Sequence, residues 1–180
     1  MAYQLIELAS VDGAGKTSVG RDLAKGLDAH YYYSPPECLR DIREHVRGLG
    51  PEAGLAYYML GNHVASNEIS EILSMSSVIA EPYTLSTQAN HGFTLGREIT
   101  IPGEIIVPDQ IIYLTASWEE IEQRLAERGE SRKVHENVPR LMKVAEQYDR
   151  LLSDRENVIR VDTTGREVEK TVEIILRKLS

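Results

Sequence analysis

The 180-residue sequence has a single cysteine, Cys38, and only one tryptophan and one phenylalanine. One thiol cannot close an internal disulfide, which excludes a disulfide-stapled secreted scaffold and favours a reducing compartment. No apolar run approaches the ~20 residues that span a bilayer, and no basic-then-apolar leader precedes the first apolar segment. These absences favour a soluble protein, and we expect a cytoplasmic location without a membrane partner.

Positive charge is also scarce, because 20 Lys and Arg residues face 28 Asp and Glu residues for a formal net charge of -8. An acidic protein does not attract polyanions such as nucleic acids or anionic membrane surfaces. We therefore expect no nucleic-acid polymer as partner, although a locally positive cleft can still bind a small anion. The apolar share of 42% is enough for an ordinary core, and the length suggests one domain over residues 1–180.

The segment 5–17 combines an apolar strand, a loop of small residues and the start of a helix. This order is typical of a phosphate-binding loop, because glycines let backbone N–H groups curl around phosphate oxygens at a helix N-terminus. In the pattern G-x-x-x-x-G-K-[ST], Lys16 neutralises the β- and γ-phosphates and the Thr17 hydroxyl ligates Mg²⁺, so ATP and Mg²⁺ are the expected cofactors. The first position of the pattern is Ser10 rather than Gly. The residues expected to bind the nucleotide phosphates are Ser10, Gly13, Ala14, Gly15, Lys16, Thr17 and Ser18.

Strand-like apolar segments alternate with amphipathic helical segments along the rest of the chain. The predicted strands are 3–9, 29–33, 77–80, 110–114 and 158–161. The predicted helices are 16–28, 37–48, 52–75, 117–128, 136–153 and 167–179, with one short helix and irregular loop between 84 and 103. Ser117 and Glu120 form a capping-box pattern at the start of one helix. The alternation predicts an α/β, three-layer fold with about five parallel strands, helices on both faces and a short lid near 129–135.

Several motifs resemble those of the thymidylate kinases, within the nucleoside monophosphate kinase group of P-loop proteins, over nearly the whole chain. The matching segments are Val11–Thr17, Glu81-Pro82-Tyr83, Ser86-Thr87, Ala89, Gly92, Pro108-Asp109, Tyr113-Leu114, Arg124, Arg128-Gly129 and Arg132. The resemblance implies a P-loop kinase fold and an ATP-dependent phosphotransferase. It implies that Thr17 and, through water, Glu81 hold Mg²⁺, and that Arg124 lies at the ATP site. The catalytic residues that it implies are Lys16, Asp12, Arg132, Arg128 and Glu81.

The acceptor half of the chain departs from the family pattern. Pro82 stands where the family has an Arg after the strand-end acid, and His63 stands at the position of a helical Arg. Arg binds phosphate bidentately and is always charged, whereas His is half-charged near pH 6.5 and Pro donates nothing. Each lost charged hydrogen bond costs about 1.5–3 kcal/mol, so a phosphate acceptor needs replacement cations. The candidate replacements are Arg40, Arg43 and Arg97. The residues expected to bind the acceptor are Tyr33, Arg40, His63, Tyr83, His91 and Tyr148.

Three hypotheses follow for a small-molecule phosphoryl acceptor. In the first, a rebuilt acceptor site binds a nucleotide such as dTMP. In the second, a kinase of the same fold phosphorylates an unphosphorylated hydroxyl of a nucleoside or other small molecule, with Asp12 or Glu37 as general base. In the third, the protein binds nucleotides without catalysis, which Pro82 supports and the complete Lys16–Thr17 pair opposes.

Two further expectations concern the tyrosines and assembly. Tyr31 and Tyr57 are expected to pack in the core rather than to act at a site. The resemblance implies a homodimer, and the apolar run 55–60 is compatible with one.

Overall fold

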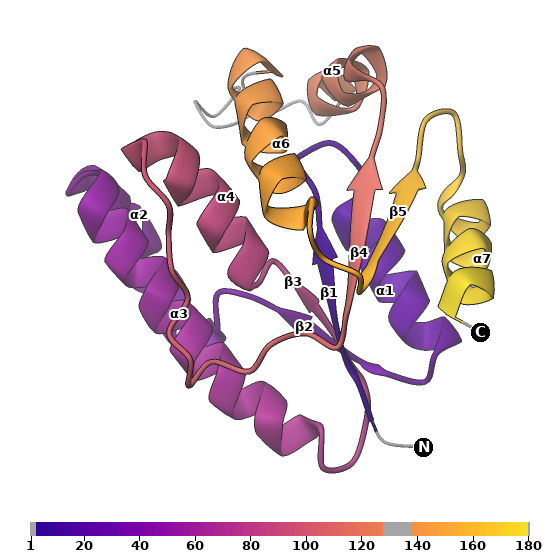
Figure 1. The fold of residues 1–180 in the computed structure, drawn as a ribbon, viewed down its shortest axis with the longest axis horizontal. Coiled ribbons are helices and arrows are strands. Elements are labelled where there is room, and N and C mark those ends of the chain that lie inside the picture. The colour runs from indigo at the N-terminus through magenta and orange to yellow at the C-terminus, as the bar shows by residue number, and fades with distance from the viewer. Residues whose placement is uncertain (1–2, 128–137, 180) are drawn as a thin grey trace.

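A computed structural model describes residues 3–127 and 138–179, and it places five parallel strands in one sheet (Figure 1). The strand order is β2-β3-β1-β4-β5, so the chain adds strands on one side of β1 and then crosses to the other. The five strands are β1 (Leu5–Ala9), β2 (His30–Tyr33), β3 (Val78–Glu81), β4 (Gln110–Thr115) and β5 (Val158–Asp162). The predicted parallel sheet is confirmed.

The three central strands are buried along almost their whole length, whereas the edge strands β2 and β5 are partly exposed. Burial on both faces explains why these segments read as continuous apolar runs rather than alternating ones. Strand β1 carries one exception, Glu7, which is fully buried. The carboxyl ends of the strands, where ligands bind in open α/β sheets, all lie at one edge.

Helices cover both faces of the sheet and complete three layers (Figure 1). On one face, α1 (Lys16–Gly26) and α7 (Val168–Leu179) pack together over a core that includes Leu8 and Ile112. On the other face, α4 (Thr84–Leu95), α5 (Trp118–Glu127) and α6 (Val138–Leu152) cover Ile111 and Tyr113. Within the described residues, no helix combines the length and apolar character needed to cross a membrane.

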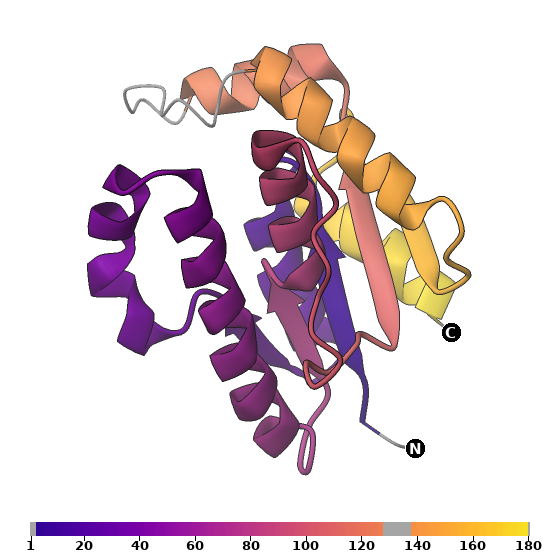
Figure 2. The ribbon, with the colours of Figure 1, turned by 60° about the vertical axis from the view of Figure 1, so that its left-hand side comes forward.

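The longer of the remaining helices lies next to α4, and its Ala65 and Ile69 pack in a buried cluster with Tyr32, Val78 and Ala80 of the sheet. Figure 2 shows α3 (Pro51–Ile72) with the shorter α2 (Arg43–Gly48) alongside it. The predicted helix 37–48 is in fact two pieces, because a 3₁₀ turn, η1 (Glu37–Ile42), precedes α2. Helix α3 begins at Pro51, whose fixed φ suits the first turn, directly after Gly50 at a φ of 107°.

The start of α5 differs from the predicted capping box. The backbone N–H of Glu120 donates to the Ser117 hydroxyl at 3.3 Å, as expected for the cap. The Glu120 carboxylate does not return to Ser117, because it accepts from the Gly165 N–H at 2.6 Å and from Arg124. The predicted lid near 129–135, with Arg128 and Arg132, lies outside the described residues.

Candidate functional site

The phosphate-binding loop joins β1 to α1 and has the backbone that its glycines predict. Gly13 and Gly15 have φ values of 91° and 93°, a left-handed region in which L side chains are strained. A Cβ on Gly13 would also lie 3.0 Å from Ile121 of α5, so that side chain would have to shift to admit a larger residue. The loop therefore depends on glycine at both positions.

Ser10, the departure from the usual pattern, contacts the lysine of the loop. The Lys16 ammonium donates to the Ser10 carbonyl at 3.0 Å and to its hydroxyl at 3.1 Å. It also lies 3.8 Å from the Asp12 carboxylate, and the Lys16 side chain is only 12% exposed. Serine at this position thus gives the lysine a side-chain partner that glycine does not offer.

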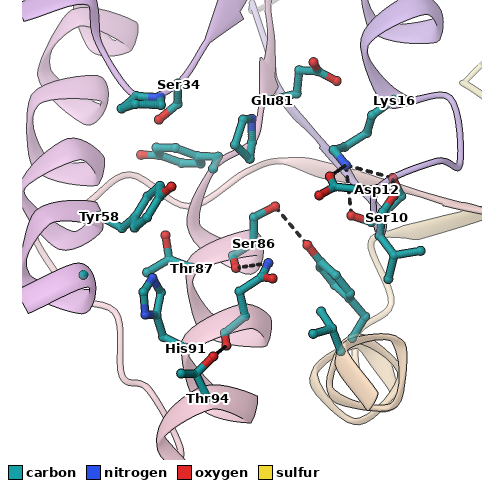
Figure 3. A pocket seen from close by; sticks show the side chains of 18 of the residues that line it. Ser10, Asp12, Lys16, Ser34, Tyr58, Glu81, Ser86, Thr87, His91 and Thr94 are labelled. Carbon is teal, nitrogen blue, oxygen red and sulfur yellow. Dashed lines mark hydrogen bonds and ion pairs between the residues drawn. The ribbon is translucent and has the colours of Figure 1, made fainter. Parts of the chain in front are cut away.

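A cavity of about 440 Å³ opens directly in front of this loop (Figure 3). Its loop end contains Ser10, Asp12, Lys16 and Glu81, and its opposite wall comes from α3 and α4. Of the residues predicted to bind ATP, Mg²⁺ or the acceptor, those that line it are Ser10, Asp12, Gly13, Lys16, Thr17, Tyr33, Glu81, Tyr83, His91 and Tyr148. One continuous cavity therefore joins the phosphate-binding loop to the predicted acceptor side.

The α3 wall is a stripe of residues four apart, Gly54, Tyr58 and Asn62, which share one helix face. The Asn62 amide is buried and donates to the Thr87 hydroxyl of α4 at 3.0 Å. His63, predicted at the acceptor, is one residue further round the helix, with its ring 3.9 Å from the Glu104 carboxylate. The structure does not bring His63 into the cavity, because a single step turns a side chain by about 100°.

Tyr58 and His91 form an aromatic pair inside the cavity, with ring centroids 5.2 Å apart. Burial lowers the pKa of His91, and the nearby Arg140 charge lowers it further, so the ring is neutral near pH 7. Its Nδ1 is buried without a hydrogen-bond partner among the described residues. The two rings are tilted by 50° to each other, so each ring separately offers an uncharged face of the kind that stacks on a heterocycle.

Three arginines from two different helices line the same cavity. Arg43 and Arg47 face it from consecutive turns of α2, and Arg43 donates to the Tyr58 hydroxyl at 3.2 Å. Arg140 enters from the first turn of α6, donates to Thr94 at 3.2 Å, and has a buried Nη1 without a partner among the described residues. The cavity lining therefore carries three arginines in addition to Lys16 of the phosphate-binding loop.

The structure distinguishes the three candidate replacement arginines. Arg43 lines the cavity, whereas Arg40 donates to backbone carbonyls of Pro35 at 3.2 Å and Tyr33 at 3.4 Å. Arg97 pairs with Glu52 at 2.8 Å on the surface. Arg40, predicted to bind the acceptor, instead braces the turn after β2.

The two buried tyrosines predicted at the acceptor use their hydroxyls for internal bonds. Tyr148 donates to the Ser86 hydroxyl at 2.9 Å, and Tyr83 donates to the Ile106 carbonyl at 3.2 Å. Burial raises the pKa of Tyr83 to about 12, so that hydroxyl stays protonated. Their rings give the cavity rigid walls.

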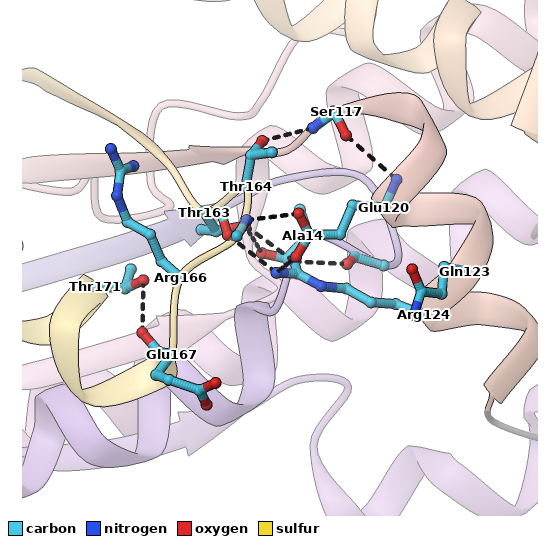
Figure 4. A network of polar contacts seen from close by, with 12 residues as sticks. Ala14, Ser117, Glu120, Gln123, Arg124, Thr163, Thr164, Arg166, Glu167 and Thr171 are labelled. Carbon is cyan, nitrogen blue, oxygen red and sulfur yellow. Dashed lines mark hydrogen bonds and ion pairs between the residues drawn. The ribbon is translucent and has the colours of Figure 1, made fainter.

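Arg124 lies behind the phosphate-binding loop rather than in the cavity (Figure 4). Its guanidinium donates to the Gly13 carbonyl at 3.3 Å, to the Thr163 hydroxyl and carbonyl at 3.0 Å each, and to Glu120. Thr163 in turn donates to the Ala14 carbonyl at 3.2 Å. Arg124 therefore ties the loop to α5 and to the segment after β5. The predicted ATP-site residues Ala14, Gly15 and Ser18 likewise lie outside the cavity lining.

Glu81 ends β3 at the loop side of the cavity and is 1% exposed. Its Oε1 accepts a hydrogen bond from the Tyr31 hydroxyl at 2.7 Å, whereas its Oε2 is buried without a partner among the described residues. A buried carboxylate oxygen is costly unless a cation or donor satisfies it, so Glu81 with Thr17 suits a hard cation such as Mg²⁺. The described residues contain no cluster of three or more His, Cys, Asp or Glu side chains that could hold a metal ion.

The two tyrosines predicted to pack in the core differ in the structure. Tyr57 is 5% exposed and its hydroxyl donates to the Leu39 carbonyl, so that prediction is confirmed. Tyr31 also packs against a buried core cluster, and its hydroxyl additionally donates to Glu81. The sequence carries a signal for this hydrogen bond, because Tyr31 lies in β2 and Glu81 ends the neighbouring strand β3, but the strand order is needed to interpret it.

Comparisons with known proteins agree with this architecture. The family model described as thymidylate kinase matches residues 10–175. A protein named "Probable thymidylate kinase" from Methanococcus aeolicus is 30% identical over 188 residues, which cover 98% of this chain and 95% of that protein.

Two solved structures share the fold at low sequence identity. Thymidylate kinase from Candida albicans aligns with a TM-score of 0.78 at 16% identity, over 99% of this chain and 91% of that one. Deoxyadenosine kinase from M. mycoides aligns with a TM-score of 0.72 at 17% identity, over 97% and 98%. Taken with the family model, these findings lead to one conclusion: the chain belongs to the thymidylate kinase family and is an ATP-dependent kinase.

Proposed function

We propose that this protein transfers the γ-phosphoryl group of ATP to a nucleoside monophosphate such as dTMP. The observation that carries the proposal is one continuous cavity, which is lined by the phosphate-binding loop, by Tyr58 and His91, and by the three arginines. Within the described lining, the cationic side chains Lys16, Arg43, Arg47 and Arg140 outnumber the carboxylates Asp12 and Glu81. In a chain of net charge -8, such a lining favours an anionic acceptor.

Phosphoryl transfer chiefly requires that the reactants are positioned and that their negative charge is neutralised, and different residues of the cavity would serve these two needs. Lys16 and the loop N–H groups would bind the β- and γ-phosphates of ATP. Thr17 and Glu81 would hold Mg²⁺, which when bound neutralises charge on the transferred group. Tyr58 and His91 would stack on the acceptor base, and the lid arginines Arg128 and Arg132 stay predicted catalytic groups. A phosphate acceptor is already ionised and needs no general base.

A second candidate is phosphorylation of an unphosphorylated hydroxyl. Two observations favour it: Pro82 supplies no guanidinium at the strand end, and Asp12 lies in the cavity beside Lys16, where it can accept a hydroxyl proton. Glu37, the other predicted base, is exposed and outside the cavity lining. The fold likeness to a deoxyadenosine kinase is compatible with either acceptor.

The test is ADP release from ATP and Mg²⁺ with a panel of acceptors. The panel contains each nucleoside, deoxynucleoside and monophosphate, together with a few sugars and aminoalcohols. Turnover on monophosphates supports the proposal, and turnover only on unphosphorylated alcohols supports the second candidate. No turnover with any acceptor, while ATP still binds, favours a nucleotide-binding protein without catalysis.

A matched pair of lysine variants checks the loop assignment. Lys16→Ala is expected to lower turnover at least about a hundredfold, because it removes a charge aimed at the transferred group. Lys25→Ala is the control, since that lysine lies on the same helix but pairs with Asp22 on the surface. Equal turnover in both variants would refute the loop assignment.

A further inference from the structure

Tyr31 and Glu81 form a hydroxyl–carboxylate pair between neighbouring strands at the carboxyl edge of the sheet. Strands β2 and β3 run parallel with Tyr33 opposite Glu81, so Tyr31 lies two residues earlier and on the same face. The Tyr31 hydroxyl donates to Glu81 Oε1 at 2.7 Å. The pair is thus set by strand register rather than by a flexible loop.

The Tyr31 ring is held in place from the side of α1. A Cβ on Gly20 would lie 3.0 Å from Tyr31 Cε2, so the helix backbone already approaches the ring as closely as packing allows. The Arg21 guanidinium lies over the ring at 5.8 Å from its centroid.

The hydrogen bond to one oxygen determines where the other oxygen lies. Glu81 Oε2 is 3.6 Å from the Cβ position of Gly20, against the face of α1, and has no partner among the described residues. Thr17 is three residues before Gly20, hence one turn away on the same helix face. The unpartnered oxygen therefore lies on the side of the magnesium ligand that the phosphate-binding loop supplies. Figure 3 shows Glu81 at the same end of the cavity as Lys16 and Asp12.

We propose that Tyr31 is a positioning residue for Glu81: it occupies Oε1 and holds the carboxylate so that Oε2 is presented to the Mg²⁺ that accompanies ATP. This inference rests on the proposed function, because it requires binding of ATP with Mg²⁺. Partners that orient a metal-binding carboxylate typically change metal affinity or activity by about 10–100-fold when they are removed. Tyr31 acts through Glu81 and does not itself contact the nucleotide.

The test compares Tyr31→Phe with Tyr32→Phe, which remove the same hydroxyl from adjacent residues of β2. The Tyr32 hydroxyl donates to Glu68 of α3, on the opposite face of the strand, and so serves as the control. Calorimetric titration measures ATP affinity with EDTA and with Mg²⁺, and the ratio of the two affinities is the magnesium enhancement. Tyr31→Phe is expected to lower this enhancement about tenfold and to leave the metal-free ATP affinity unchanged. Tyr32→Phe is expected to change neither quantity.

Each other outcome has a distinct meaning. An unchanged enhancement in Tyr31→Phe overturns the inference, as does an equal loss of affinity with and without Mg²⁺, which marks a merely structural role. A double-mutant cycle with Glu81→Gln adds a second check, because the effect of Tyr31→Phe should disappear once the carboxylate is gone. Absence of ATP binding by the wild-type protein refutes the proposed function itself. When the wild-type protein does bind ATP, activity supplies a further readout: the Mg²⁺ concentration for half-maximal turnover is expected to rise about tenfold in Tyr31→Phe and not in Tyr32→Phe.

Discussion

Glu7 makes the stability of this protein depend on pH in a direction unusual for a carboxylate. Its side chain is 0% exposed on the central strand β1, where Oε2 accepts from the Thr84 hydroxyl and Oε1 from the Leu85 N–H, both at 2.9 Å. Burial raises the pKa of Glu7 from 4.5 to about 7, although these hydrogen bonds and Arg155 oppose the shift. The folded protein therefore holds the proton that the unfolded chain has already lost.

The sign and size of the effect follow from this difference. Because the folded state binds the proton more tightly, the contribution of Glu7 is complete below pH 4.5 and is lost as the pH rises through about 7. At 1.36 kcal/mol per pKa unit, the free energy of unfolding should fall by about 2.5 kcal/mol between pH 5 and pH 8. Glu7→Gln keeps the shape and a neutral amide, so this variant should not lose that stability.

The assay is urea unfolding of wild type and Glu7→Gln at several pH values, followed by circular dichroism. The difference between the two proteins isolates Glu7 from every other titrating group, and Glu98→Gln, on the surface, is the control. The variant is expected to gain about 2.5 kcal/mol relative to wild type from pH 5 to pH 8. A difference that stays constant with pH would show that Glu7 ionises normally, and the argument from burial would then be wrong.

Three further predictions concern the cavity and assembly. Arg43→Ala is expected to raise the KM for a monophosphate acceptor at least about tenfold, because a charged contact is lost, and to leave ATP affinity unchanged. The surface variant Arg97→Ala should change neither quantity, and equal KM values for the two variants in steady-state kinetics would contradict the assignment. Asn62→Ala is expected to raise the acceptor KM, while His63→Ala, on the neighbouring helix face, should not; equal effects would show that the α3 stripe is misassigned. Leu60 is 49% exposed on α3. If the predicted homodimer uses this helix, light scattering should give a monomer mass for Leu60→Glu. A dimer mass for this variant would exclude the Leu60 face of α3 as the interface.

Much of the fold could be predicted from the sequence because each strand signal is local. The apolar segments between 3 and 9 and between 110 and 114 lie within one or two residues of β1 and β4, since burial on both faces requires unbroken apolar runs. The phosphate-binding loop could also be predicted, because its glycines, lysine and threonine are consecutive. The predicted helix 37–48 was less accurate, because the 3₁₀ turn η1 replaces its first half and α2 begins only at Arg43.

The acceptor side could not be derived in the same way because it depends on helix rotation and on distant segments. A one-residue error in matching α3 exchanges Asn62 for His63 and turns the predicted side chain away from the cavity. Arg47 and Arg140 were missed, since neither lies in a recognisable motif. A signal for Arg140 was present: it continues the face of Val144 and Tyr148 at a spacing of four residues.

The contrast between the acidic chain and its cationic cavity has a kinetic consequence. With a net charge of -8, the outer surface repels anions, but this repulsion is screened beyond about 8 Å at physiological ionic strength. A small nucleotide that comes within this distance of the opening meets the focused field of Lys16 and the cavity arginines and is drawn inward. A long polyanion cannot fit its charges into a cavity of this size and continues to meet the acidic exterior. We therefore expect the protein to select by molecular size as well as by charge, and added salt should slow nucleotide association.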